Sequence, residues 1–247
     1  MSELRKVQIA TPTYDGKVTA EFATALLDTV IACAQQGILV SWNVVRGVPL
    51  VALARNRLVA DFLDSDFDEL VFIDADVRWW PEGFLRLLSW DKDIVAGAYP
   101  YKQLPEAYPI EIKVDSFGAL AQCPDTGLLS CDYAPTGFMR IRRQVFTRLA
   151  EGLGGADEIK VIEQIRDGGR KPEYLCFFDT ARRGTEWLGE DVEFCRRWRE
   201  SCEGQIWSDP EIALEHSGEQ VYAGHLGDFL RARAAPPNAR PKLSVVG

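Results

Sequence analysis

The stretch "LVFIDADVRWWP", residues 70–81, decides how the chain is expected to fold. Four apolar residues run directly into two aspartates separated by one residue, and two tryptophans and a proline follow. A short, fully apolar run is typical of a central parallel strand that is covered on both faces. Carboxylates at the end of such a strand resist burial unless a cation or hydrogen-bond donors offset their desolvation. The stretch therefore predicts a buried strand that carries Asp74 and Asp76 into a ligand site.

The sequence on both sides of this strand alternates between strand and helix patterns. Further strands are expected at residues 6–10, 38–45 and 93–100, and helices at 19–36, 49–63 and 81–90. This alternation indicates a doubly wound α/β sheet whose ligands bind at the carboxyl ends of the strands.

The second half of the chain is less regular. We expect a strand, a turn, a strand and a helix over 127–149, a helix over 190–202 and short strands over 205–216. Residues 152–173 are polar and rich in glycine, so they are expected to form a mobile loop.

The composition sets broad limits on function. The chain has 247 residues, 47% of them apolar, which is enough to bury the core of one large domain. Its net charge of −9 argues against a generally basic nucleic-acid-binding surface. The end of the chain differs, because residues 229–247 contain arginines and a lysine but no acidic residue.

Neither the cysteines nor the histidines follow a metal or disulfide pattern. The six cysteines show no CxxC spacing, and His216 and His225 are the two histidines. Mostly buried thiols in a reducing compartment are expected. No signal peptide opens the sequence, and no apolar run of about 20 residues could span a membrane. We therefore expect a soluble cytoplasmic protein without a membrane segment.

Asp-x-Asp pairs occur four times, and only one of them directly follows an apolar strand. That pair, Asp74 and Asp76, could share a divalent cation with phosphate oxygens, because Mg²⁺ and Mn²⁺ prefer oxygen ligands and few protein groups. The alternative is a solvated strand end with no ligand.

The stretch at residues 187–218, "WLGEDVEFCRRWRESCEGQIWSDPEIALEHSG", supplies the second half of the pattern. Glu190 and Asp191 open a predicted helix, a strand follows, and His216 comes later. In this order the chain resembles glycosyltransferases of the GT-A fold, especially the family 2-like branch, with some likeness to Anp1-type and phage-encoded glycosyltransferases. The resemblance covers roughly residues 6–224.

The resemblance implies an α/β GT-A (Rossmann-like) fold with a doubly wound mixed sheet. It implies a single domain over 1–230, with a nucleotide-binding half at 1–110 and an acceptor half at 111–230. A basic C-terminal tail, 231–247, would follow.

The same resemblance implies a metal-dependent glycosyltransferase that uses a nucleotide-diphosphate sugar. Asp76 would hold Mn²⁺ or Mg²⁺, which stabilises the charge of the departing diphosphate as a Lewis acid. Asp74 would contact the metal or the ribose, and His216 would be a third metal ligand or a donor to phosphate. Asp191, beside Glu190, would be the general base of an inverting reaction.

Simpler roles remain open for these residues. Acidic residues at a helix N-terminus favour the macrodipole by ~0.3–1 kcal/mol each without any catalytic role. His216 could be a core histidine. A retaining reaction also remains open, because Asp-x-Asp occurs in retaining relatives.

Several other positions are expected to line the site. The segment after the first strand and the "ARNR" stretch would bind the base, ribose or pyrophosphate, together with the strand-end motif: Thr11, Pro12, Tyr14, Arg55, Asn56, Asp74, Ala75 and Asp76. Thr136 and Gly137 are expected on the acceptor side. Arg55 could equally be a solvated helix residue.

The leading expectation for the acceptor is a hydroxymethylated base in DNA, as in transferases that phages carry. The clusters Arg140, Arg142, Arg143 and Arg182, Arg183 and the basic tail could grip phosphates, and the base would be flipped out of the duplex. The acidic net charge favours a glycan or a small molecule instead.

Two other functions fit parts of the sequence. "LVFIDADV" also resembles the nucleophile strand of haloacid-dehalogenase-like phosphatases, although two strand–helix units precede it here. The other is a nucleotide- or sugar-binding module that has lost turnover.

Overall fold

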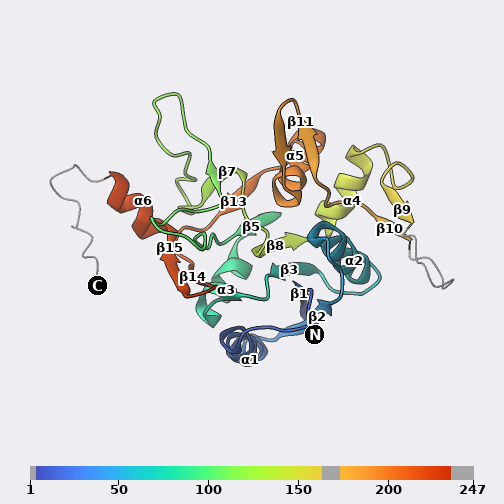
Figure 1. The fold of residues 1–247 in the computed structure, drawn as a ribbon, viewed down its shortest axis with the longest axis horizontal. Coiled ribbons are helices and arrows are strands. Elements are labelled where there is room, and N and C mark those ends of the chain that lie inside the picture. The colour runs from blue at the N-terminus through green and yellow to red at the C-terminus, as the bar shows by residue number, and fades with distance from the viewer. Residues whose placement is uncertain (1–3, 163–172, 235–247) are drawn as a thin grey trace.

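The computed structural model describes residues 4–162 and 173–234, and its centre is a mixed eight-stranded sheet (Figure 1). The strand order is β2-β1-β3-β8-β5-β13-β7-β6. These strands are β1 (Arg5–Pro12), β2 (Ile38–Val45), β3 (Glu69–Ile73), β5 (Ile94–Ala96), β6 (Glu111–Ile112), β7 (Leu129–Tyr133), β8 (Phe138–Arg142) and β13 (Ile206–Ser208). The strands β1, β2 and β3 are parallel, and β8 runs antiparallel between β3 and β5.

Helices cover both faces of this sheet, as Figure 1 shows for α1 and α5. The helices of the described residues are α1 (Ala20–Gln35), α2 (Val51–Leu63), α3 (Pro81–Ser89), α4 (Arg143–Gly152), α5 (Glu190–Cys202) and α6 (Leu226–Ala234). Alternate residues of β3 enter two cores: Leu70 and Phe72 pack with α2, α4 and α5, whereas Val71 and Ile73 pack with α1 and α3. The predicted doubly wound α/β sheet is confirmed.

Local sequence signals explain how several elements begin and end. Helix α1 begins after Thr19, whose side-chain oxygen accepts a hydrogen bond from the Phe22 N–H at 3.1 Å. It ends before Gly37, which has a φ of 69° that favours glycine. Pro81 occupies the first position of α3, where its missing N–H costs nothing.

Smaller sheets and hairpins flank the main sheet. They are formed by β4 (Val77–Arg78), β9 (Lys160–Ile162), β10 (Glu173–Leu175), β11 (Ala181–Arg183), β12 (Glu186–Leu188), β14 (Ala213–Ser217) and β15 (Val221–His225). Strand β14 pairs with both β15 and β4. The mobile loop expected over 152–173 is corrected in part, because β9 pairs with β10; its residues 163–172 lie outside the described residues.

The end of the chain and the thiols complete the fold. The boundary predicted at residue 230 falls inside α6, and residues 235–247 of the expected basic tail lie outside the described residues. All six cysteines are free thiols. Within residues 4–162 and 173–234, no helix combines the length and the apolar character needed to cross a membrane.

Two of the arginines expected to grip phosphate stabilise the fold instead. Arg140 is fully buried; its Nη1 donates to Glu69 Oε2 at 2.8 Å, and its Nη2 donates to two backbone carbonyls. Arg143 donates to the backbone carbonyls of two residues at the end of α2, Phe62 and Leu63, and of two residues just after it, Ser65 and Phe67. Arginine satisfies such orphan carbonyls with its several donors.

Candidate functional site

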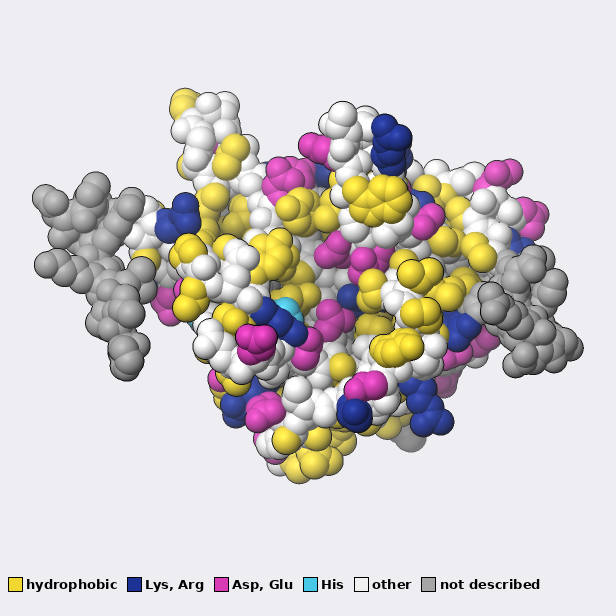
Figure 2. Space-filling view, viewed as in Figure 1, with side chains coloured by type: hydrophobic (Ala, Val, Ile, Leu, Met, Phe, Trp, Pro, Cys, Tyr) yellow, Lys and Arg dark blue, Asp and Glu magenta, His cyan; other side chains and the backbone are white. Residues whose placement is uncertain are grey.

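A cleft of about 530 Å³ opens at the carboxyl ends of β1 and β3. It is lined by Pro12, Thr13, Tyr14, Asp15, Lys17, Val18, Thr19, Val51, Asp74, Ala75, Asp76, Tyr99 and His216. Figure 2 shows acidic side chains, a basic side chain and a histidine gathered in a hollow at the centre of one face. The predicted position of the ligand site, at the strand ends, matches this cleft.

Asp74 is held by two neighbours at the end of β3. Arg55 Nη2 lies 3.1 Å from Asp74 Oδ1, and the Tyr99 hydroxyl donates to Asp74 Oδ2 at 3.4 Å. Gly137 makes this arrangement possible, because a Cβ at that position would lie only 2.5 Å from Asp74 Oδ2. Asp74 therefore faces the cleft as one half of an ion pair.

Asp76 points to a different set of groups. Lys102 Nζ contacts Asp76 Oδ2, and His216 Nε2 lies 3.6 Å from Asp76 Oδ1. Burial raises the pKa of Asp76, but His216, when both of its ring nitrogens are protonated, and Lys102 outweigh it and bring the pKa to about 2. Asp76 is therefore an ionised carboxylate at any physiological pH.

The fold brings His216 to Asp76 through strand pairing. In the small sheet His216 of β14 stands opposite Val77, and the Ser217 N–H donates to the Asp76 carbonyl at 2.8 Å. His216 Nδ1 lies 2.9 Å from the carbonyl oxygen of Pro100, which can only accept a hydrogen bond. In the neutral ring Nδ1 therefore carries the proton, and Nε2 presents its lone pair toward Asp76.

The predicted three-ligand metal site is only partly assembled. Among residues 4–162 and 173–234, no three histidine, cysteine or acidic groups stand close enough together to hold a metal ion. Asp74 is drawn to Arg55, whereas Asp76 and His216 remain together. A carboxylate and a correctly protonated imidazole fit Mn²⁺ or Mg²⁺ whose other ligands are phosphate oxygens and water.

Glu190 and Asp191 begin α5 on the other side of Arg55. Arg55 Nε lies 3.2 Å from Glu190 Oε1, so one guanidinium joins Asp74 to the start of α5. Burial raises the pKa of Asp191, and the negative charge of Glu190 raises it further. Burial raises the pKa of the Tyr99 hydroxyl, and the negative charge of Asp74 raises it further. The charges of Asp191 and Asp76 add to the same shift. Neither Glu190 nor Asp191 is among the residues that line the cleft, and Glu190 is connected to Asp74 through Arg55.

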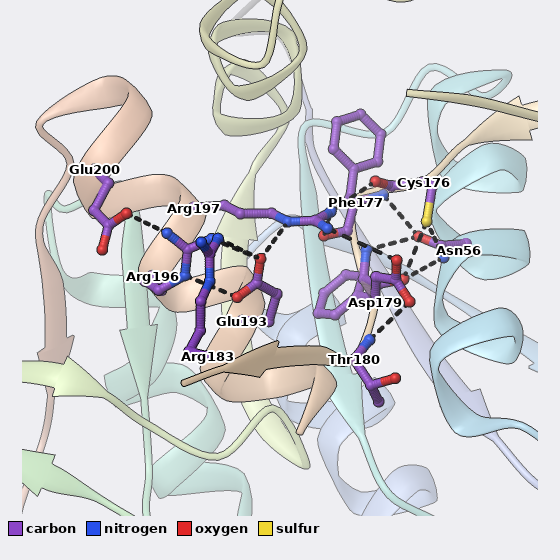
Figure 3. Close-up of polar contacts among 11 residues, drawn as sticks. Asn56, Cys176, Phe177, Asp179, Thr180, Arg183, Glu193, Arg196, Arg197 and Glu200 are labelled. Atoms are coloured by element: carbon purple, nitrogen blue, oxygen red, sulfur yellow. Dashed lines mark hydrogen bonds and ion pairs between the residues drawn. The ribbon is translucent and has the colours of Figure 1, made fainter. Parts of the chain in front are cut away.

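A buried acidic residue, Glu193, anchors α5 to its surroundings (Figure 3). Its carboxylate accepts hydrogen bonds from Arg196 and Arg197 at 2.7 to 2.9 Å, and Arg183 of β11 lies 3.9 Å away. Arg197 also donates to the carbonyl of Cys176 at 3.2 Å. These contacts connect α5 to the segment before it and hold the helix start in place.

Asn56 binds the backbone of a neighbouring segment instead of making the predicted contact with a ligand. It is 3% exposed, and its side-chain oxygen accepts from the N–H groups of Phe177 and Phe178 at 2.9 Å each (Figure 3). Its amide nitrogen donates to the Phe178 carbonyl at 2.7 Å. All three contacts hold backbone, so Asn56 fixes the path of that segment.

The segment after β1 supplies one wall of the cleft. Pro12 and Tyr14 line it as predicted, and Tyr14 is 69% exposed. Thr11 is fully buried and accepts a hydrogen bond from Trp42 Nε1 at 2.9 Å, so its predicted place in the wall is taken by Thr13. The period-2 alternation of a strand explains this, because Thr11 still belongs to β1.

Among the side chains that contact Asp74 or Asp76, sequence reasoning missed Tyr99 and Lys102. Tyr99 and Lys102 follow the short strand β5, whose carboxyl end lies at the same edge of the sheet as that of β3. The strand-end rule that identified Asp74 applies equally to Tyr99. No sequence signal pointed to Lys102, which reaches the site from an irregular segment.

Two buried polar atoms near the site have no hydrogen-bond partner within the described part of the chain. They are Arg55 Nη1 and Thr136 Oγ1, in residues that are 3% and 1% exposed. Native proteins leave few buried donors unpaired, so each such atom points to a missing partner.

Comparison with known proteins adds evidence on the fold. No protein-family model matches the sequence, and no curated protein matches it. Among solved structures, A197 from STIV matches with a TM-score of 0.51 and 16% identity, over 90% of this chain and 91% of that one. This likeness over nearly the whole chain is one of fold.

Two further solved structures are more distant. A Drosophila β1,4-galactosyltransferase 7 mutant, in complex with manganese, UDP-Gal and xylobiose, has a TM-score of 0.46 and 13% identity, over 92% of this chain and 73% of that one. S. aureus TarS has a TM-score of 0.41 and 11% identity, over 92% of this chain and 62% of that one. The predicted mixed α/β sheet is confirmed by the strand order and by the helices on its two faces.

Proposed function

We propose that this protein is a glycosyltransferase that moves a sugar from a nucleotide-diphosphate sugar to an acceptor hydroxyl. The observation that carries the proposal is the placement of two acidic pairs, one on each side of Arg55. Asp74 and Asp76 follow the end of β3, and Glu190 and Asp191 begin α5 on the other side of the guanidinium. A donor diphosphate at the first pair would direct its sugar toward the second.

Asp76 and His216 are the residues that would hold Mn²⁺ or Mg²⁺. The bound cation supplies Lewis-acid stabilisation of the negative charge that grows on the departing diphosphate. Asp74 orients Arg55 and Tyr99 rather than completing the metal site. The complex of the galactosyltransferase 7 mutant with manganese and UDP-Gal is compatible with this choice of cation and donor.

Asp191 would act as the general base of an inverting reaction. It takes the proton of the acceptor hydroxyl while the oxygen attacks the anomeric carbon and the bond to the diphosphate breaks. Its raised pKa makes it a better proton acceptor than an ordinary aspartate. Glu190 assists by raising that pKa and by positioning Arg55.

The nucleotide would bind along the wall after β1. Tyr14 is exposed within the cleft, and an exposed aromatic ring there suits stacking with a base. Lys17, also in the wall, suits the negative charge of the donor.

The described residues favour a glycan or a small molecule as acceptor over a hydroxymethylated DNA base. Arg140 and Arg143 are committed to internal partners. Arg142 pairs with Asp91 and stands opposite Glu69, at the end of β3 remote from the cleft. Of the five clustered arginines predicted to grip DNA phosphates, the exposed pair Arg182 and Arg183 on β11 remains as a candidate.

The two other functions considered receive less support. A phosphatase of the haloacid-dehalogenase type would need a free nucleophilic Asp74, which here is paired with Arg55 and Tyr99. A binding module without turnover would bind the nucleotide sugar without consuming it, which the turnover assay detects.

The test is turnover of UDP-, GDP- and CMP-linked sugars with Mn²⁺, in the presence of either mixed saccharides or duplex DNA containing 5-hydroxymethylcytosine. Products are analysed by mass after digestion of the DNA to nucleosides. Sugar-linked saccharides would support the preferred acceptor, and a glycosylated nucleoside would establish DNA as the acceptor. Release of phosphate without any sugar donor would replace the proposal with a phosphatase.

A further inference from the structure

Asp76 is already paired with a positive charge of the chain itself. Lys102 Nζ contacts Asp76 Oδ2, while Oδ1 faces His216 Nε2 at 3.6 Å. The ammonium thus occupies one oxygen of the carboxylate that the proposed function assigns to a divalent cation.

The position of Lys102 is supported by its surroundings. Its stem passes close to Gly218 in the turn after β14, where an added Cβ would lie 3.0 Å from Lys102 Cδ. The backbone before it is fixed by Pro100, whose carbonyl contacts His216, and the Tyr101 N–H donates to the Ala107 carbonyl at 2.8 Å. The same segment therefore orients the histidine and delivers the lysine.

Electrostatics makes two cations at this carboxylate incompatible. A divalent ion between Asp76 and His216 would stand within a few ångströms of the ammonium and repel it. The Lys102 side chain is 36% exposed, so it has a route into solvent or toward a bound anion. A donor diphosphate supplies such an anion, and lysine binds phosphate as a compact point charge.

We propose that Lys102 is a built-in competitor of the divalent cation for Asp76. In the donor-free protein the ammonium neutralises Asp76 and weakens metal binding. When a diphosphate enters, Lys102 moves to the phosphate oxygens and the cation takes its place. Cation and donor then bind cooperatively, because each favours the state without the Lys102–Asp76 contact.

This inference rests on the proposed function, and it is tested with the metal alone. Mn²⁺ is titrated into the nucleotide-free protein, and free Mn²⁺ is followed by electron paramagnetic resonance. Lys102→Met keeps the stem and removes the charge, whereas Lys102→Arg keeps the charge. Lys113→Met is the matched control, because Lys113 is similarly exposed, at 37%, and lies 3.9 Å from Asp132 away from the cleft.

Lys102→Met is expected to bind Mn²⁺ at least about 5-fold more tightly than the wild-type protein, the lower range of typical coupling between sites. Lys102→Arg and Lys113→Met should bind as the wild-type protein does. Adding Asp76→Asn to Lys102→Met should remove the gain. An unchanged or weaker affinity in Lys102→Met, a gain that survives Asp76→Asn, or no Mn²⁺ binding by either protein would overturn the inference.

Turnover of nucleotide sugars, measured separately, distinguishes the two failures. Donor consumption together with unchanged Mn²⁺ affinity in Lys102→Met would overturn only the role of Lys102. Tighter Mn²⁺ binding in that variant, without consumption of any donor, would leave the competition intact and overturn the proposed transferase.

Discussion

Arg55 joins Asp74 to Glu190, with Nη2 3.1 Å from Asp74 Oδ1 and Nε 3.2 Å from Glu190 Oε1. The Arg55 side chain is 4% exposed, and its Cζ lies over the Phe72 ring, 5.2 Å from the ring centroid. This one side chain connects the end of β3 to the beginning of α5, which are far apart in the sequence. A planar fork with several donors suits such bridging better than an ammonium does.

Arg55→Met should lower the free energy of unfolding by about 3–5 kcal/mol, because two carboxylates lose their shared buried partner. Arg55→Lys should recover part of this stability but little of the turnover, since one ammonium cannot reproduce both contacts. Urea unfolding gives the stability change. Arg46→Met, at an exposed arginine, is the control. Equal unfolding midpoints for Arg55→Met and the wild-type protein would show that the bridge is not formed.

Asp191→Asn should leave donor binding nearly unchanged and lower kcat by about 100-fold or more, because only proton transfer is lost. Donor affinity is measured by calorimetry and kcat by steady-state kinetics. Asp228→Asn is the matched control, since Asp228 is an exposed aspartate in the first turn of α6. If the two variants keep the same kcat, Asp191 serves only the helix dipole.

The pH profile of kcat should lose activity on its acidic side as Asp191 becomes protonated. Burial and the charge of Glu190 raise the pKa of Asp191, so this loss should begin at a higher pH than an ordinary aspartate would give. In Glu190→Gln the repulsion disappears while Arg55 still favours the ionised form. The acidic limb should therefore move to lower pH. A limb that stays in place would mean that Asp191 is not the titrating base.

Asp76→Asn should abolish Mn²⁺-dependent nucleotide binding, because a neutral amide replaces the one ionised ligand beside His216. The measurement is the thermal shift produced by UDP, GDP or CMP with and without Mn²⁺, since a ligand stabilises the state that it binds. Asp91→Asn, in an Asp-x-Asp pair away from the cleft, should behave as the wild-type protein. An unchanged Mn²⁺-dependent shift in Asp76→Asn would place the metal elsewhere.

Sequence patterns predicted a site at the end of β3 because an apolar run, which predicts burial, is followed directly by charged residues. The apolar run of β3 ends at Ile73, and Asp74 and Asp76 follow it into the cleft as expected. The different partners of Asp74 and Asp76 were not predictable. Asp74 pairs with Arg55 of α2, and Asp76 faces His216 because β14 pairs with β4; both partners lie elsewhere in the sequence.

Arginines were the residues that sequence reasoning placed least well. Arg140 lies in an apolar strand, "FMRIR", and its burial depends on Glu69, which pairs with it from a strand far away in the sequence. A local window shows a positive charge and suggests solvent or phosphate. The carbonyls that Arg143 satisfies are likewise set by tertiary packing at the end of α2.

Glu69→Gln tests this structural role. Glu69 Oε1 lies 2.5 Å from Arg5 Nε and Oε2 lies 2.8 Å from Arg140 Nη1, which is buried. Removing the carboxylate charge leaves Arg140 buried without a counter-ion, which should cost about 3–5 kcal/mol of unfolding free energy. Glu151→Gln, at an exposed position of α4, should cost almost nothing. Urea unfolding at pH 7 measures both.

The pKa of Glu69 also determines how the stability difference between the wild-type protein and Glu69→Gln changes with pH. Burial raises this pKa, but Arg5 and Arg140 outweigh burial and hold it below the ordinary value. The stability that ionised Glu69 contributes is therefore present above the unfolded-state pKa of about 4.3 and is lost as the pH falls through the lower folded-state pKa. The stability difference between the wild-type protein and Glu69→Gln should shrink over that acidic window. A difference that stays constant or grows on acidification would contradict the buried ion pair.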